Sequence, residues 1–299
     1  MFKLGKLKVL KRVRTKYASL KKDEHTSKLA LWYLVKYLYM NFRLYLLKQE
    51  VEISYCKGKV KALVKKGDGI AANFHSRFHE PTDTIFLINY LDNTDHFIDI
   101  GANVGHFTLI AAKIAQCKVT AIEPVPATFA RLVKNVELNE IENSVNCLNI
   151  GLAEETGILR FSDSFHTTNK VISEGSGGVE IEVKKLDDLC ENAHPTVLKI
   201  DVEGYEYFLL KGALKTLDLE SLNVIIIELN ESSKTYGVDE EMIIDLLIEK
   251  SFKPISFNPV KNTITQLKRK DSSKFNTIFI KDIDQLLARI KSNRFATDL

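Results

Sequence analysis

The sequence predicts an α/β fold: a mostly parallel sheet with helices on both faces, preceded by an N-terminal extension of helix and β-hairpin. Two observations support this. From residue 96 onward, short apolar runs alternate with segments of helical periodicity, as in parallel sheets with crossover helices. Before residue 80, a helical pattern gives way to alternating apolar and polar residues. We therefore expect an extension over 1–79 and a main domain over 80–299, within a chain of 299 residues whose 45% apolar and 27% charged content is ordinary for a globular protein.

Residues 1–22 form a basic arm that holds nine of the 42 basic residues and no acidic one. The remaining chain therefore has 33 basic and 39 acidic residues, a net charge of −6, against +3 for the whole. Such an arm predicts an anionic partner, such as phospholipid or nucleic acid, or else a solvated terminus. The basic residues of the arm are Lys3, Lys6, Lys8, Lys11, Arg12, Arg14, Lys16, Lys21 and Lys22.

Residues 29–47 are apolar and rich in aromatic side chains, but Lys36, Asn41 and Arg43 interrupt them. A charge at the centre of a bilayer costs about 2.5–3.5 kcal/mol, so a full membrane span is disfavoured. We expect a helix packed on the body, with an interfacial helix that works with the basic arm as the alternative.

The four cysteines are far apart in the sequence and form no CxxC pair, which indicates neither a zinc site nor a disulfide framework. The first 25 residues lack the apolar core and cleavage site of a signal peptide. The expected location is a reducing compartment, the cytoplasm, with peripheral contact to a membrane as a further option.

The elements follow in order along the chain. Residues 51–72 alternate around Lys57-Gly58, which predicts a hairpin, and Pro81 marks the first turn of a helix over 80–92. We expect strands at 96–100, 118–122, 145–149, 157–161, 179–183, 196–200, 224–228, 254–257 and 277–280. We expect helices at 108–115, 127–139, 205–214 and 239–250.

The segment FIDIGANVGHFTL, residues 97–109, joins the first strand of this sheet to its first helix. Gly101 and Gly105 permit unusual backbone angles and close approach of a ligand. Their GxxxG spacing matches neither the dinucleotide nor the phosphate-loop fingerprint. Asp99, near the end of the strand, is placed to accept hydrogen bonds from an amino group, directly or through water. A ligand with an amino-acid head fits this turn better than a pyrophosphate does.

The segment VTAIEPVPATF places Glu123 at the end of the second strand, where Pro124 stops it. A carboxylate at this position can accept both hydroxyl groups of a ribose. A helix-start role for Glu123 is the alternative, although Pro126 and Thr128 already serve that helix. A ribose together with an amino-acid head describes S-adenosylmethionine.

Four segments resemble the FkbM family of S-adenosylmethionine-dependent methyltransferases: FIDIGANVGHFTL, AIEPVPATFARLVKNVELN, NIGLAEETG and VLKIDVEGYEYFLLKGA. The resemblance covers roughly residues 80–230. It implies a class I methyltransferase (Rossmann-like) fold, with a seven-stranded sheet whose last strand is antiparallel. It also implies methyl transfer, commonly to an oxygen of a sugar or natural product.

The resemblance also implies roles for individual residues. The glycine block would hold the methionine part of the donor through Asp99, Gly101, Ala102, Asn103 and Gly105. Glu123, followed by Pro124, would bind the ribose. Gly151, Leu152 and Ala153 would border the adenine. His106 stands where the family often has an aromatic residue, and we include it among the donor-binding residues.

KIDVEGYE, residues 199–206, ends the strand expected beside the first one. Asp201 should therefore face the donor, where it would bind the ammonium group, orient the acceptor or act as a base; a helix N-cap is the alternative. Glu228 and Asn230 would meet Asp201 across the cleft. Lys199 would lie inside the strand beside these acids, either as a catalytic group or in a structural ion pair.

Oxygen ligands of this kind would suit Mg²⁺, but we expect Asp201 and Glu228 to bind the acceptor directly, and a divalent metal is not favoured. The polar loop at 162–178 is a candidate lid or acceptor clamp, and its His166 is an alternative base. His75 and His79 have HxxxH spacing but no evident third ligand, so zinc is not expected.

The sequence therefore predicts a methyltransferase that moves the methyl group of S-adenosylmethionine to a hydroxyl of a carbohydrate or small metabolite. A nicotinamide-dependent oxidoreductase is an alternative, although GxGxxG is absent. A membrane-surface binding protein with a vestigial donor pocket is a second alternative, and the basic arm and residues 29–47 support it. A nucleic-acid substrate is not expected, because the main domain is acidic and lacks an NPPY-like motif.

Overall fold

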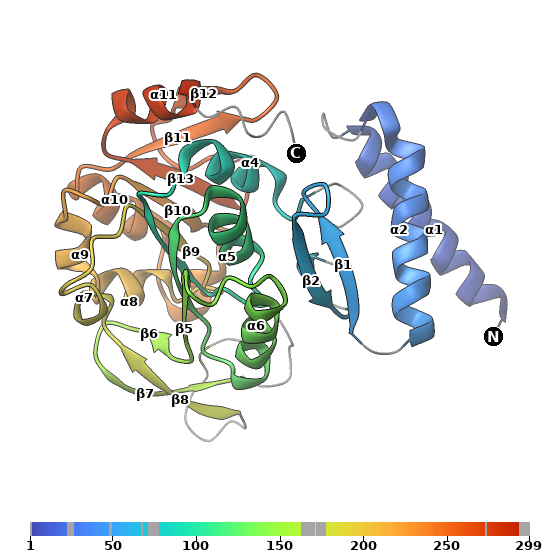
Figure 1. Ribbon diagram of the computed structural model, residues 1–299, viewed down its shortest axis with the longest axis horizontal. Helices are drawn as coiled ribbons and strands as arrows, with labels where there is room; N and C mark the ends of the chain where they lie inside the picture. Colours follow the sequence, from blue (N-terminus) through green and yellow to red (C-terminus); the bar gives the residue numbers. More distant parts are fainter. Residues whose placement is uncertain are drawn as a thin grey trace.

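The computed structural model describes residues 2–22, 27–47, 50–66, 68–70, 78–162, 171, 178–272 and 274–292. An α/β body carries two long N-terminal helices on one side, and a two-stranded hairpin lies between the helices and the body (Figure 1). The helices are α1 (Phe2–Lys22) and α2 (Ala30–Leu47), joined through a short 3₁₀ turn, η1 (Ser27–Leu29). The hairpin strands are β1 (Val51–Tyr55) and β2 (Val60–Val64).

The body is built on an eight-stranded sheet in the order β12-β11-β13-β10-β9-β3-β4-β5. The strands β3, β4, β5, β9 and β10 are parallel to one another, and β13 is antiparallel to both of its neighbours. Their bounds are β3 His96–Ile100, β4 Lys118–Ile122, β5 Val145–Leu148, β9 Val197–Ile200, β10 Val224–Glu228, β11 Lys253–Asn258, β12 Thr263–Gln266 and β13 Asn276–Ile280. The predicted fold class, with an antiparallel last strand, is confirmed.

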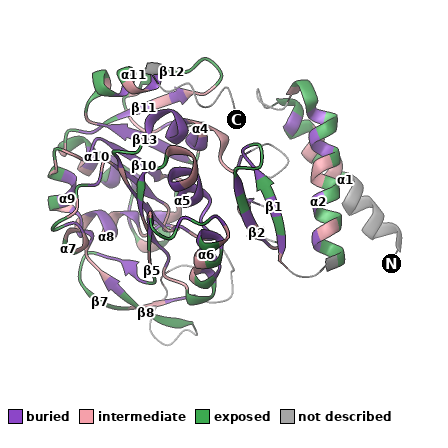
Figure 2. Cartoon of the chain, viewed as in Figure 1, coloured by how far each residue is buried: buried purple, intermediate pink, exposed green. Residues whose placement is uncertain are grey.

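Each face of the sheet has its own apolar cluster, because the strands are apolar on both sides and helices cover them (Figure 2). The helices of one cluster are α4 (Pro81–Tyr90), α5 (His106–Ile110), α6 (Pro126–Leu138) and α11 (Ile283–Ser292). Those of the other are α7 (Leu186–Leu189), α8 (Glu206–Lys211), α9 (Leu214–Asp218) and α10 (Glu240–Glu249). A small second sheet, β6-β8-β7, lies beside them, formed by β6 Gly151–Leu152, β7 Gly157–Phe161 and β8 Val179–Lys184.

Several details differ from the sequence prediction. The sheet has an eighth strand, β12, which pairs antiparallel with β11 as an edge hairpin. The helix expected at 108–115 starts two residues earlier as α5 and continues as a π-helical turn, η3 (Ala111–Ala115). The helix expected at 205–214 is two helices, because α8 ends at Lys211 and Gly212 and Ala213 separate it from α9. Gly212 lies close to the small sheet, since a Cβ there would lie 2.1 Å from the carbonyl oxygen of Ala153.

The strand order reverses between β3 and β9. From β3 the chain builds outward through β4 and β5, and it then returns to build β9 and β10 on the other side. Ligands in open α/β sheets bind beyond the carboxyl ends of the strands at such a point. Gly101 and Asp201 directly follow these two strands, and the Asp201 N–H donates to the Ile100 carbonyl at 3.0 Å.

The hairpin belongs to the same packed core as the body, because one apolar cluster includes residues of α2, β1, β2 and the sheet. The side chains of Asn135, on α6, and Asn139, directly after it, accept hydrogen bonds from the backbone N–H groups of Leu63 and Lys61, at 2.7 and 2.8 Å. The buried Arg131 of α6 pairs with Asp68, beyond the hairpin. The proposed boundary at residue 79 therefore separates two regions that share a core; it stays a prediction.

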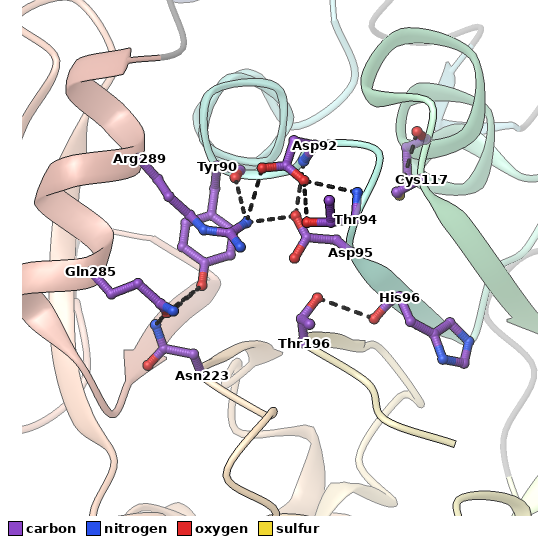
Figure 3. A network of polar contacts seen from close by, with 11 residues as sticks. Tyr90, Asp92, Thr94, Asp95, His96, Cys117, Thr196, Asn223, Gln285 and Arg289 are labelled. Atoms are coloured by element: carbon purple, nitrogen blue, oxygen red, sulfur yellow. Dashed lines mark hydrogen bonds and ion pairs between the residues drawn. The ribbon is translucent and has the colours of Figure 1, made fainter. Parts of the chain in front are cut away.

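A polar network ties the opposite, amino-terminal edge of the sheet together (Figure 3). Arg289 of α11 donates to Asp95, which precedes β3, at 2.6 Å, and to the Tyr90 carbonyl at 3.2 Å. The Asn223 side chain, before β10, donates to Tyr90 Oη at 3.1 Å and to Gln285 at 2.5 Å. These bonds fix α11 and α4 at the edge remote from the strand ends where Gly101 and Asp201 lie.

Within the described residues, none of the helices has both the length and the apolar character that crossing a membrane requires.

Candidate active site

A cavity of about 240 Å³ opens at the carboxyl ends of β3, β4, β9 and β10. Of the predicted donor-binding residues, Gly101, Asn103, His106, Glu123, Pro124, Gly151 and Leu152 line it. Of the predicted catalytic residues, Asp201 and Glu228 line it. Five of the predicted residues do not lie on its wall: Asp99, Ala102, Gly105, Ala153 and Lys199.

The glycine turn is shaped first by contacts within the chain. Gly101 has a φ of 77°, and a Cβ there would lie 1.8 Å from the Asp201 carbonyl oxygen. Gly105 has a φ of 96°, and a Cβ would lie 2.7 Å from Leu132 of α6. Both positions need glycine because of its left-handed backbone and because β9 and α6 pass so close. Gly101 also faces the cavity, whereas Gly105 serves packing alone.

Asp99 does not line the cavity. Its Oδ2 accepts hydrogen bonds from the Thr108 N–H at 2.9 Å and from Thr108 Oγ1 at 2.6 Å. Burial raises the pKa of this carboxyl to about 6, despite those bonds. Asp99 therefore anchors the first turn of α5 to the end of β3, and its contact with an amino group, directly or through water, stays a prediction.

Glu123 enters the cavity at the end of β4 and is held by the backbone on both oxygens. Oε2 accepts from the Asn103 N–H and Oε1 from the Val125 N–H, each at 3.0 Å. Its residue is only 7% exposed, and burial raises the pKa of the carboxyl to about 7. The Asn149 side chain donates to the Glu123 and Pro124 carbonyl oxygens, which fixes the turn. The carboxylate is therefore a rigid acceptor that faces the cavity.

A buried lysine lies behind the wall formed by β9 and β10. Lys199 is 1% exposed, and its Nζ lies 3.2 Å from Asp201 Oδ2. Burial alone would lower the pKa of Lys199, but four nearby carboxyl groups outweigh it and raise that pKa above the usual value. These groups belong to Asp201, Glu80, Asp83 and Glu228. Lys199 therefore forms a buried ion pair with Asp201, the structural one of its two predicted roles, and its catalytic role stays a prediction.

Glu228 is the most perturbed acid on the cavity wall. Burial and the neighbouring Asp201 raise the pKa of its carboxyl to about 9, although Lys199 opposes the shift. Within the part of the chain that the structure describes, its buried Oε2 has no hydrogen-bond partner. A protonated carboxyl with an unfilled oxygen can hydrogen-bond a hydroxyl group of a ligand.

Among the residues of the wall that sequence reasoning did not predict are two titratable ones, His79 and Glu80, which belong to the connection from the hairpin to α4. His79 Nε2 lies 3.3 Å from Glu80 Oε1, and burial lowers the pKa of the imidazole although Glu80 opposes this. Gly69 makes room for the ring, since a Cβ there would lie 2.6 Å from it. Glu80 also accepts from the Asn276 side chain at 2.6 Å. The sequence offered one signal here: Pro81 predicted the start of a helix, which places Glu80 at the N-cap position.

The hairpin also reaches the site. The ring of Tyr55, on β1, stacks on His106 with centroids 5.7 Å apart, and His106 Nε2 lies 2.9 Å from Thr84 Oγ1. Burial lowers the pKa of His106 well below its usual value, so the ring is neutral. His106 therefore joins the extension to the cavity wall.

The opposite wall comes from the small sheet and from the start of α8. Gly151 and Leu152 of β6 line it together with Phe161 and Tyr205. Ala153 packs instead in the apolar cluster of the small sheet. His75, His166 and most of the predicted loop 162–178 lie outside the described residues. Among the described residues, no group of three histidine, cysteine or acidic side chains is arranged to hold a metal ion.

The Methyltransferase FkbM domain matches residues 99–254, which is more than half of the chain. The chain belongs to the FkbM methyltransferase family. The match spans the glycine turn, Glu123, the small sheet, Asp201 and Glu228, so the cavity lies largely within the family's domain.

Two curated methyltransferases are similar to this chain. The hexuronic acid methyltransferase AglP of Haloferax volcanii is 34% identical over 169 residues, which cover 54% of this chain and 65% of that protein. The methyltransferase sdnD of Sordaria araneosa is 27% identical over 168 residues, which cover 44% of this chain and 65% of that protein. The chain thus spans just under two thirds of the length of these relatives.

Among solved structures, P. horikoshii TYW2 in complex with MeSAdo aligns with a TM-score of 0.42 and 14% identity. The alignment covers 78% of this chain and 72% of that chain. Likeness at this level says nothing about a ligand, so the fold assignment rests on the strand order and the family match.

Proposed function

We propose that this FkbM-family protein transfers the methyl group of S-adenosylmethionine to a hydroxyl oxygen of a carbohydrate or small metabolite. One observation carries the choice of donor. The described lining of the cavity contains no lysine or arginine. It contains five acidic residues: Glu80, Glu123, Asp201, Glu203 and Glu228. Although Glu228 is protonated at neutral pH, the other four acids and the lack of a lysine or arginine on the described wall favour a cationic ligand and disfavour the pyrophosphate of a nicotinamide dinucleotide. When bound, S-adenosylmethionine supplies an electrophilic methyl group on a positively charged sulfur.

Glu123 fits the ribose of that donor. Each carboxylate oxygen has two acceptor positions, and each takes one backbone N–H in this structure. Each therefore keeps a position for a ribose hydroxyl. Gly101 and Asn103 would border the methionine part, Gly151 and Leu152 the adenine. Asp99 supports this site from behind by anchoring α5.

Asp201, Glu228 and His79 form the proposed acceptor side. Methyl transfer to oxygen needs the hydroxyl oriented and its proton removed. Asp201 and the neutral His79 imidazole are the groups able to take that proton, and Glu228 would orient the acceptor through Oε2. The proposal needs no metal, so treatment with EDTA is expected to leave activity unchanged.

AglP is named a hexuronic acid methyltransferase, which supports a carbohydrate acceptor for this chain as well. We therefore propose incubating the protein with methyl-labelled donor and a panel of uronic acids, neutral sugars, small alcohols and nucleic acids. Label transferred to sugars or small alcohols supports the proposal. Label found only in nucleic acid contradicts it.

Calorimetric titration with S-adenosylhomocysteine tests the donor site separately from catalysis, because this product carries no methyl group to transfer. Glu123→Gln should weaken binding roughly tenfold to a hundredfold, because charge-assisted bonds to two hydroxyls contribute about 1.5–3 kcal/mol. Glu142→Gln, at an exposed position, is the matched control and should bind as the wild type does. Tight binding of NAD with none of S-adenosylhomocysteine would end the proposal.

We further propose that the protein works in the cytoplasm, since its four cysteines are all free thiols and three of them are buried. Peripheral contact with an anionic membrane is a separate proposal, because it depends on the N-terminal helices and not on the cavity.

A further inference from the structure

Helix α2 carries apolar side chains on both of its faces. One face packs inward, where Ala30, Tyr33 and Leu34 contact α1 and Met40 and Leu44 join the core of the hairpin and body. The other face points to solvent (Figure 2). Its exposed residues are Leu31 at 66%, Trp32 at 50%, Val35 at 57%, Leu38 at 41%, Tyr39 at 60%, Phe42 at 59%, Tyr45 at 71% and Leu46 at 59%.

These eight residues form one continuous stripe, defined here as the outer face of α2. They recur at spacings of three and four, which places them above one another along a helix. Monomeric globular proteins rarely expose so large a contiguous apolar surface, and those that do use it to bind something. The sequence alone left a packed helix and an interfacial helix as alternatives, whereas the structure has a packed face and an unpaired one on the same helix.

Basic side chains edge this outer face. Lys36 Nζ lies 3.8 Å above the Trp32 ring, and the Arg43 guanidinium lies 5.8 Å from the Tyr39 ring. Their long aliphatic stems can follow the apolar surface while the charged ends reach outward. Trp and Tyr beside Lys and Arg are the side chains enriched where a protein meets the headgroup region of a bilayer.

The rest of the helix pair has the same sign of charge. Residues 2–22 hold nine basic residues and residues 27–47 hold three more, with no acidic residue in either stretch. Lys11, Arg14, Lys21, Lys22 and Lys28 are exposed. A second copy of this chain is a poor occupant for the outer face, because pairing would bring two basic helix pairs together.

We propose that the outer face of α2, together with the basic helix α1, binds an anionic membrane surface, with α2 lying in the interface rather than crossing it. The aromatic and aliphatic stripe enters the headgroup region, and the lysine and arginine side chains pair with lipid phosphates. This proposal does not depend on methyl transfer, because none of these residues lines the cavity.

The test is co-sedimentation of the full-length protein with phosphatidylcholine vesicles, with and without phosphatidylglycerol. The wild type should bind the anionic vesicles, and high salt should weaken binding because it screens surface charge. A variant with Trp32→Ser, Phe42→Ser and Tyr45→Ser should have an affinity for the anionic vesicles at least roughly tenfold lower, since it loses the apolar area that enters the interface. A charge-reversal variant with Lys21→Glu, Lys22→Glu and Lys28→Glu should lose the preference for anionic lipid.

A matched control removes three exposed apolar side chains from the body instead: Ile158→Ser, Met242→Ser and Val260→Ser. It should bind vesicles as the wild type does, and thermal unfolding should show all variants folded. Equal binding of the wild type to neutral and anionic vesicles would overturn the proposal. A control variant that lost as much vesicle binding as the aromatic variant would also overturn it. The proposal would also be overturned if the wild type formed a dimer that did not bind vesicles and the aromatic variant were a monomer. A second copy of the chain would then cover the outer face of α2.

Discussion

The body and the N-terminal helix pair use similar apolar residues in opposite ways. In β10, Val224, Ile225, Ile226 and Ile227 are all 0% exposed, because strands and helices cover both faces of the sheet. In α2, more than half of the apolar side chains with a described exposure are exposed, and they gather on one face. The body leaves only scattered apolar side chains exposed, such as Ile158 and Val260, whereas the helix pair presents a continuous apolar stripe.

Charge shows the same contrast. The body buries Lys199 among carboxyl groups, so each charge there depends on its partners. The helix pair holds twelve basic residues and no acid, and its Lys11, Arg14, Lys21, Lys22 and Lys28 are exposed. The two proposals above therefore assign an internal binding site to the body and an external one to the helix pair. Four changes test that contrast.

Replacing Lys199 with methionine should have the largest effect on the body. The buried acids would lose their cation, and breaking such a pair lowers the free energy of unfolding by about 3–5 kcal/mol. Urea unfolding at neutral pH measures it. Lys253→Met, at an exposed position of β11, is the control and should change little. Equal stability of both variants would mean that Asp201 and Glu228 do not need Lys199.

Gly101→Ala should lower the free energy of unfolding by about 3 kcal/mol, because a left-handed backbone and a collision with the Asp201 carbonyl act together. Gly157→Ala is matched to it, since a Cβ at Gly157 meets nothing within 4 Å. The melting temperatures of the two variants measure this difference in stability. A Gly101→Ala protein as stable as Gly157→Ala would show that β3 and β9 are not so closely joined at the site.

The two faces of α2 can be compared within one helix. Met40 is 2% exposed, so Met40→Ala should cost about 2 kcal/mol of stability through the cavity that it leaves. Phe42 is 59% exposed, so Phe42→Ala should change stability by less than about 0.5 kcal/mol although it removes a larger side chain. Denaturant titration distinguishes the two. A large loss for Phe42→Ala would mean that the chain itself covers the outer face.

The last expected effect concerns pH. Because burial and Asp201 raise the folded-state pKa of Glu228 to about 9, the folded protein binds a proton that the unfolded chain releases above its ordinary pKa of 4.5. The folded state therefore loses stability as pH rises from about 4.5 through about 9. We expect a fall of roughly 2 kcal/mol between pH 7 and 9.

Glu228→Gln should flatten that slope, and Glu249→Gln, at an exposed helix position, should keep it. Unfolding curves at three pH values measure both. A slope unchanged in Glu228→Gln would assign the titration to another acid of the cluster.

Strand ends were the most predictable part of this protein. The bounds of β3, β4 and β10 agree with the sequence prediction, because buried parallel strands read as short apolar runs. Glu123 and Asp201 were predictable for the same reason, since each directly follows or ends such a run. Side-chain contacts were harder to predict: Asp99 lies on a strand with the expected bounds, yet its Oδ2 bonds Thr108 and the residue does not line the cavity.

His79 and Glu80 were not predictable as site residues. They lie about 120 residues before Asp201 in the sequence, and only the packing of the hairpin on α6 brings them to the same wall. The eighth strand and the division of α8 from α9 also escaped prediction, because an edge hairpin and a glycine contact depend on neighbours distant in the sequence.

The sequence by itself determined the alternation of strands and helices, the glycine turn, the acids at the strand ends and the basic character of the first helix. All of these depend on residues close together in the chain, where periodicity and backbone geometry act. The tertiary structure alone decided which acids meet around Lys199, that the segment after the hairpin supplies part of the cavity wall through Gly69, Ile70, His79 and Glu80, and that α2 leaves one apolar face exposed. Those features depend on which surfaces remain uncovered after distant segments pack together, and that is a property of the whole fold.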